Sequence, residues 1–197
     1  MSALADAYLA GGARFIQIRC KHASSADFLA TCEGIVARAR PEGAIVIVND
    51  RADVARLSGA DGVHVGQADL EPVEARRIVG SEAVVGFSTH TGDQVRVAAR
   101  QPVDYIAVGP IFGTSTKDTG YDQVGTTFVS EAARILGEAG DAMPIVAIGG
   151  ITLERASGVI LAGATSVAVV SDLLATGDPE SRVRDYLQAL REASNRK

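Results

Sequence analysis

Two aspartates, Asp50 and Asp69, each follow a short apolar run of the chain. The runs 45–48 and 62–65 are rich in β-branched residues, which is typical of parallel strands covered on both faces. A short helical stretch joins them, so both strands end at the same edge of a sheet and the two carboxylates lie side by side. Carboxylates ~4 Å apart repel by about 4 kcal/mol at an effective dielectric constant near 20, so the pair needs a cation between them or one of the two must stay protonated. Oxygen ligands without a cysteine or histidine pair favour Mg²⁺, and the alternative role for Asp50 is to cap the following helix.

Two cations, Arg19 and Lys21, leave the predicted strand 14–19 on alternate positions. Arginine offers a planar fork of donors and lysine a point charge, and the two together suit a diphosphate group. The alternative is an ion pair with Asp50 or Asp69, which is compatible with ligand binding.

Small residues open the loops after the last two predicted strands. Gly149 and Gly150 precede a helix over 153–161, and Val170 and Ser171 precede a short helical turn over 172–175. In (β/α) barrels these two loops usually form a phosphate site, because the N–H groups at helix N-termini bind anions. A glycine pair alone is weak evidence, whereas the two loops together favour a phosphate site.

The loop GPIFGTSTKDTG, residues 109–120, has glycine at both ends, small hydroxyl residues and Lys117. Such a loop can close over a ligand and bring its lysine to an anion, and the alternative is a solvated surface loop. Of the three histidines, His64 lies within a strand and is interpreted as an interior residue rather than a base. His22 is predicted to be exposed, and His90 remains a candidate contact.

The elements that position these residues repeat as strand–helix units. A helix that ends on small residues runs four times into a strand with β-branched positions, which favours a (β/α)₈ TIM barrel over an open doubly wound sheet. The pattern predicts one domain over residues 1–197 with seven strands, the first strand of the barrel being absent. The predicted strands span 14–19, 45–48, 62–65, 84–88, 105–108, 145–148 and 166–170, and the predicted helices span 2–9, 24–38, 49–59, 73–79, 91–100, 126–136, 153–161 and 179–193.

Composition and charge exclude several classes of function. The net charge is −5 without a basic block, which argues against a nucleic-acid partner. No apolar run reaches the ~20 residues of a membrane helix. With only two cysteines, Cys20 and Cys32, the sequence predicts a cytoplasmic protein with reduced thiols. A homo-oligomer is compatible with the sequence, which does not set the oligomeric state.

Several ordered motifs of the chain resemble the thiamine-phosphate synthase family. They are QIRCK (17–21), VNDRADVA (48–55), GADGVHVGQADL (59–70), VVGFSTH (84–90), DYIAVGPIFGTSTK (104–117), PIVAIGGI (144–151) and GATSVAVVS (163–171). Because they cover essentially the whole chain in order, they are far more specific together than any one alone. The fold of the family is a (β/α)₈ barrel, which agrees with the barrel that the repeated strand–helix units predict.

The resemblance implies a transferase that joins 4-amino-5-hydroxymethyl-2-methylpyrimidine diphosphate to a thiazole phosphate or its carboxylate. Thiamine phosphate and diphosphate are the products. In this chain Mg²⁺ would lie on Asp50 and Asp69, and Arg19, Lys117 and Ser88 would be catalytic. The expected contacts to the pyrimidine diphosphate are Gln17, Arg19, Lys21, Asn49, Ser88 and Lys117. Those to the thiazole phosphate are Thr114, Thr116, Gly150, Val170 and Ser171.

The family differs from this sequence at one point, because it has a strand upstream of the position of Ser2. We expect the loss of that strand to leave a gap and two unpaired sheet edges, between the strands 14–19 and 166–170. Two alternatives follow from the resemblance. One is a thiazole tautomerase-like isomerase, against which the basic and acidic set argues because a tautomerase has no diphosphate to bind. The other is a non-catalytic barrel that binds a phosphate ligand.

Overall fold

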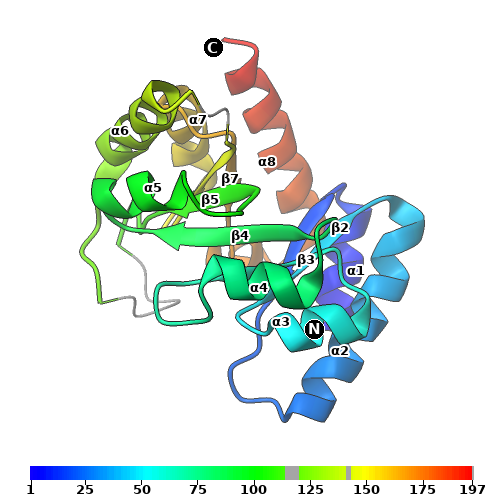
Figure 1. Ribbon diagram of the computed structural model, residues 1–197. Helices are drawn as coiled ribbons and strands as arrows, with labels where there is room; N and C mark the ends of the chain where they lie inside the picture. Colours follow the sequence, from blue (N-terminus) through cyan, green and yellow to red (C-terminus); the bar gives the residue numbers. More distant parts are fainter. Residues whose placement is uncertain (114–119, 141–142, 197) are drawn as a thin grey trace.

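The computed structural model describes residues 1–113, 120–140 and 143–196, and seven parallel strands form its centre (Figure 1). Each strand pairs with the next one along the chain, so the sheet order is the chain order. The strands are β1 (Phe15–Ile18), β2 (Ile45–Asn49), β3 (Gly62–Val65), β4 (Val84–Thr89), β5 (Tyr105–Val108), β6 (Ile145–Ile148) and β7 (Ser166–Ala168). All the described ladders are parallel, so the carboxyl ends of the strands meet at one edge of the sheet.

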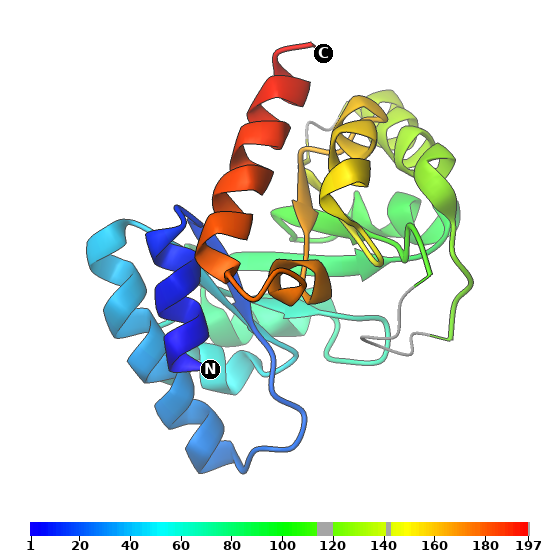
Figure 2. The ribbon, with the colours of Figure 1, turned by 180° about the vertical axis from the view of Figure 1, so that it is seen from behind.

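Helices alternate with the strands and form the outer layer. They are α1 (Ser2–Ala10), α2 (Ser25–Ala39), α3 (Ala52–Ser58), α4 (Pro72–Val79), α5 (Gly92–Ala98), α6 (Gly125–Glu138), α7 (Leu153–Leu161) and α8 (Pro179–Ser194). Two short 3₁₀ turns, η1 (Arg40–Glu42) and η2 (Ser171–Leu174), complete the described elements. The last helix, α8, packs against both α7 and α1, so that it joins the two ends of the chain (Figure 2). A helix long and apolar enough to cross a membrane is not found among the described residues.

Helix starts follow the local sequence where a capping residue is present. The side chain of Ser24 accepts a hydrogen bond from the Asp27 amide at the start of α2, and Thr91 does the same for α5. Asp178 caps α8, and Pro179 occupies its first turn, where a missing N–H costs nothing. The predicted start of a helix at 49–50 is too early by two to three residues, since α3 begins at Ala52 with Arg51 as its N-cap.

The two faces of the sheet differ in chemistry. Side chains that point toward the helices are apolar and fully buried, as at Val46, Val48, Val63 and Val65. The alternate positions point to the inner face and carry the polar side chains, because successive residues of a strand face opposite ways. The inner face holds the buried polar residues Asn49 and His64, whereas the buried Thr89 ends β4 on the opposite face.

The sheet is curled and TIM-like, with β1 and β7 at its edges. In the described part of the chain each of these two strands pairs on one side only. Apolar side chains near the edges remain accessible, with Phe15 46% exposed and Val170 53% exposed. β7 also ends at Ala168, two residues before the predicted end of that strand. The predicted seven parallel strands with two unpaired edges are confirmed.

Candidate active site

The first carboxylate of the predicted metal pair follows β2 directly. Asn49 ends this strand and is 7% exposed, and Asp50 comes next with a left-handed φ of 65°. The Asp50 amide donates to the His64 carbonyl at 2.8 Å, which ties this turn to β3, and its Oδ1 atom is buried. Arg51, not Asp50, occupies the N-cap position of α3, so the capping alternative for Asp50 is wrong.

The second carboxylate lies in the turn after β3. Asp69 is exposed, and its Oδ2 accepts the Gly66 amide at 2.8 Å, which fixes the orientation of the carboxylate. In the same turn Gln67 donates to the Ser88 carbonyl at 2.6 Å, joining the turn to β4. No group of three or more histidine, cysteine or acidic side chains arranged around a metal is found in the described ranges. Two carboxylates with substrate oxygens and water are still a set that suits Mg²⁺.

The cations after β1 differ in their surroundings. Arg19 has its Nε and Nη2 atoms buried, and neither has a hydrogen-bond partner among the residues that the structure describes. Lys21 is exposed. Over the described ranges the ion pairs include neither residue, so the predicted alternative of a salt bridge to Asp50 or Asp69 is not formed. Buried guanidinium donors left without acceptors are costly, and they indicate a place for an anion.

A hydrogen-bonded chain crosses the inner face next to these residues. His64 Nε2 lies 2.8 Å from Ser88 Oγ, and His64 Nδ1 lies 2.9 Å from the Tyr105 hydroxyl. The Gln17 side chain bonds to the same phenol, whose pKa is raised by burial. The prediction that His64 is an interior residue is confirmed. Tyr105 was missed, although a tyrosine that starts an otherwise aliphatic strand was a usable signal.

The predicted phosphate loops follow β6 and β7. Gly149 and Gly150 have φ values of 100° and 59°, and Val170 and Ser171 are exposed. Asp172 Oδ2 accepts the Leu153 amide at 3.3 Å, so one N–H group at the start of α7 is already used. The two loops lie at the same edge of the sheet as the acidic and basic residues.

The predicted lid residues Thr114, Thr116 and Lys117 lie outside the described residues. The flanks of their loop are described. The Gly113 amide donates to Gln123 Oε1 at 2.9 Å, and the His90 ring stacks on the ring of Tyr121 with centroids 4.0 Å apart. The two flanks thus converge at the ends of β4 and β5.

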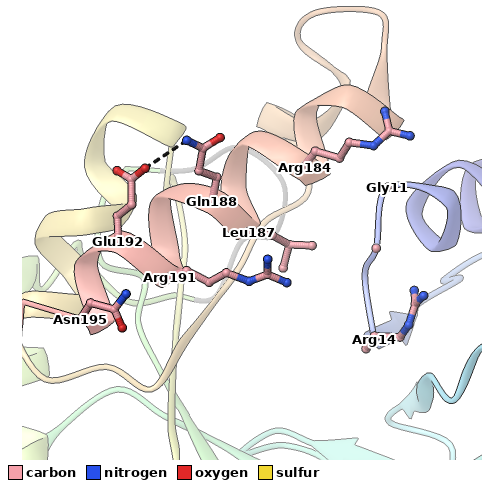
Figure 3. A pocket seen from close by; sticks show the side chains of 9 residues that line it. Gly11, Arg14, Arg184, Leu187, Gln188, Arg191, Glu192 and Asn195 are labelled. Carbon is pink, nitrogen blue, oxygen red and sulfur yellow. Dashed lines mark hydrogen bonds between the residues drawn. The ribbon is translucent and has the colours of Figure 1, made fainter.

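A cavity of about 640 Å³ lies at the opposite edge of the sheet, where β1 begins (Figure 3). Gly11, Gly12 and Arg14 line it on one side and α8 on the other, with Arg184, Leu187 and Arg191 facing the entry to β1 (Figure 3). None of the predicted site residues is part of its lining. The chemistry predicted from the sequence therefore belongs to the carboxyl edge and not to this cavity.

Comparison with known proteins agrees with the motifs. Residues 1–173 match the family model described as thiamine monophosphate synthase. The chain belongs to this family. It is 43% identical over 182 residues to the thiamine-phosphate synthase of Koribacter versatilis, covering 92% of this chain and 82% of that protein. It is 39% identical over 182 residues to the thiamine-phosphate synthase of Chlorobium phaeovibrioides, covering 92% of this chain and 85% of that protein. A solved structure, thiamine phosphate pyrophosphorylase from Pyrococcus furiosus, matches with a TM-score of 0.88 at 26% identity, covering 98% of this chain and 90% of that one.

Within this thiamine monophosphate synthase chain, the structure brings most of the predicted residues to one edge of the sheet. Gln17 belongs to β1, Asn49 to β2 and Ser88 to β4, while the other described residues of the set follow strand ends. The edge contains a carboxylate after β2, another after β3 and, after β1, a guanidinium with two buried nitrogen atoms that lack partners among the described residues. Opposite charges at neighbouring strand ends are suited to a metal-bound diphosphate.

Proposed function

We propose that this chain is a Mg²⁺-dependent transferase that joins the pyrimidine diphosphate to thiazole phosphate, giving thiamine phosphate and diphosphate. Membership of the thiamine monophosphate synthase family supports the reaction. The single observation that carries the assignment of the site is the Arg19 guanidinium, with two buried nitrogen atoms that lack acceptors in the described part of the chain. A diphosphate supplies acceptors of the right charge and geometry.

Asp50 and Asp69 would hold the metal. The fit rests on the donor chemistry, because both are hard oxygen ligands that follow adjacent strands, and the Gly66 amide fixes one of them. When bound, Mg²⁺ would neutralise charge on the departing diphosphate. The same pair without a cation would repel, so the proposal explains why two carboxylates follow adjacent strands.

The remaining residues would bind and orient the substrates. Arg19 would donate to the diphosphate oxygens as negative charge grows there on leaving, with Lys21 and Lys117 adding positive charge. Asn49 of β2 and Ser88 of β4 lie on the inner face of the sheet, where the pyrimidine would bind. Thr114, Thr116, Gly150, Val170 and Ser171 would hold the thiazole phosphate, with the loop that contains Lys117 excluding water.

The decisive experiment incubates the purified chain with both substrates and Mg²⁺ and measures thiamine phosphate by chromatography. We expect product with the unaltered chain and a loss of about 100-fold or more in Arg19→Met, because one donor to developing charge typically contributes 10²–10³ in rate. Asp50→Asn should abolish the Mg²⁺-dependent rate. A properly folded chain that gives no thiamine phosphate would refute the synthase and leave the tautomerase and the non-catalytic binder.

A stability measurement separates ligand binding from damage to the fold. Arg19→Met removes unpaired buried donors, so the ligand-free variant should be more stable by about 1–3 kcal/mol and should lose the rise in Tm caused by Mg²⁺-diphosphate. The matched control is Arg96→Met on α5, because Arg96 is half-exposed and pairs only with the exposed Asp93 in the described region. That variant should keep both the Tm and the ligand-induced rise.

Two broader features belong to the same proposal. The space between the edges of β1 and β7 would be the position of an eighth strand in a closed (β/α)₈ barrel, which is supported by the exposed apolar side chains Phe15 and Val170 near these edges. The protein would act in the cytoplasm, as supported by Cys20 and Cys32, which form no disulfide.

A further inference from the structure

Three strands place one histidine, one glycine and one tyrosine in a row across the inner face. His64 of β3 is in register with Gly86 of β4, and Gly86 is in register with Tyr105 of β5. Both rings are buried, with His64 6% and Tyr105 5% exposed, and they stack with centroids 5.5 Å apart. The row lies two residues before Ser88, on the same face of β4.

Gly86 allows this arrangement. A Cβ atom at position 86 would lie 2.5 Å from His64 Nδ1 and closer still to the Tyr105 ring and hydroxyl oxygen. Because Gly86 has no side chain, the His64 and Tyr105 rings can approach each other above it and form their hydrogen bond. The hydrogen bond and the stacking between the two rings hold the imidazole of His64 against Tyr105.

The direction of each hydrogen bond depends on the tautomer of His64. Burial raises the pKa of Tyr105, so its hydroxyl keeps its proton and has one hydrogen to donate. In the tautomer that we assign, Tyr105 donates this hydrogen to His64 Nδ1, which lies 2.9 Å away. The imidazole then carries its own proton on Nε2 and donates it to Ser88 Oγ at 2.8 Å.

The Ser88 hydroxyl is the last group in this series of hydrogen bonds. Within the described residues His64 is the only partner of Ser88 Oγ, and in this arrangement the oxygen accepts the hydrogen bond from His64 Nε2. The Ser88 proton is therefore free to be donated to a bound molecule. This matters at the site, because Ser88 lies on the inner face between β3 and β5, beside the edge where the acidic and basic residues meet.

We propose that His64 is a positioning residue, held by Tyr105, that directs the Ser88 hydroxyl to donate to an acceptor atom of the pyrimidine diphosphate. The inference rests on the proposed function and adds to it His64 and Tyr105, which do not touch the reacting atoms. It also makes Gln17, Tyr105, His64 and Ser88 one unit, in which the loss of His64 or Tyr105 has the same effect as the loss of Ser88.

The test is a double-mutant cycle on kcat/KM for thiamine phosphate formation with Ser88→Ala, His64→Leu and the double variant. Each single variant should lose about 10- to 100-fold, and the double variant should lose no more than the larger single loss, because the groups act as a unit. His64→Gln, whose amide can still donate to Ser88 Oγ, should recover activity to within about 5-fold of the unaltered chain. Ser130→Ala is the matched serine control, since its hydroxyl bonds the Ala162 carbonyl in the outer layer.

The outcomes are distinct. Losses that multiply in the double variant, or equal losses in His64→Gln and His64→Leu with unchanged Tm, would overturn the role of His64 while leaving the synthase intact. The absence of product with the unaltered chain would overturn the proposed function, and the role of His64 with it.

Discussion

A methyl group added at Gly86 should be one of the most damaging small changes in this protein. In Gly86→Ala the new Cβ would lie 2.5 Å from His64 Nδ1 and nearer to Tyr105, where real Cβ contacts are essentially never found. Overpacking a tight interior costs about 1–3 kcal/mol, and breaking the His64–Tyr105 hydrogen bond costs about 1 kcal/mol more. We therefore expect a loss of about 2–4 kcal/mol in the free energy of unfolding.

The assay is equilibrium unfolding in urea, followed by far-UV circular dichroism, with the slope compared between variants. Gly137→Ala in α6 is the matched control, because a Cβ there would meet no described atom within 4 Å. Gly137 lies in the last turn of α6, where an alanine is tolerated and should stabilise by at most about 0.5–1 kcal/mol, so the two substitutions should differ in sign. A loss below about 1 kcal/mol in Gly86→Ala would refute the reasoning, since the rings would then have room to move.

A second variant shows whether Tyr105 causes the loss of stability that we expect in Gly86→Ala. In a Tyr105→Ala background most of the steric conflict is gone, so adding Gly86→Ala should cost much less than it does alone. The same cost in both backgrounds would mean that the strand backbone, rather than the tyrosine, resists the methyl group.

Further predictions concern residues outside the row. Asp172→Ala should destabilise by about 3 kcal/mol in urea unfolding, because Asp172 accepts from Tyr186 at 2.6 Å and pairs with the largely buried Arg182 at 2.9 Å; a loss below about 1 kcal/mol would contradict this. Burial, followed by the neighbouring Cys20 and Glu33, raises the pKa of Cys32 to about 11, and the side chain is fully buried. At pH 8 Cys32 should therefore react with a thiol reagent only as fast as the protein opens, whereas the partly exposed Cys20 reacts at once; equal rates in the native protein would disprove it.

The strands were predictable because their apolar, β-branched runs are local features of the sequence. The errors lie where the outcome depends on neighbours or on backbone conformation. The strand predicted over 166–170 ends at Ala168, since β7 has a partner on one side only in the described region. The helix predicted from 49–50 starts at Ala52, because Asp50 takes a left-handed conformation that its residue type permits but does not require.

The site likewise has a part that the sequence predicts and a part that it does not. The gathering of polar residues at one edge of the sheet could be predicted from the sequence alone, because parallel strands end at the same edge. The link between His64 and Tyr105 depends on the register of three strands, in which Gly86 lies between the two rings. Register arises from pairing between segments far apart in the chain, so no local pattern contains it.

The glycine pair after β6 shows how one sequence pattern can have two causes. A Cβ at Gly149 would lie 2.6 Å from the Pro110 side chain, and one at Gly150 would lie 2.9 Å from the Phe112 side chain. Packing against the loop after β5 therefore requires both glycines, whether or not they bind phosphate. The same packing has a consequence for the site, however. Arg155 of α7 donates to the Gly150 carbonyl at 3.2 Å and lies over the Phe112 ring at 4.6 Å, which fixes the start of that loop against β6.

The close fit of these glycines thus joins two parts of the predicted phosphate site. Gly113, at the end of this fixed segment, leads directly into the residues that contain Thr114, Thr116 and Lys117. Because its carbonyl lies close to where a Gly150 Cβ would be, the loop starts beside the residues predicted to bind the thiazole phosphate. A side chain at position 150 would therefore move the start of the Lys117 loop as well as the phosphate loop, so that the two functions of the pair cannot be separated by mutation at that position alone.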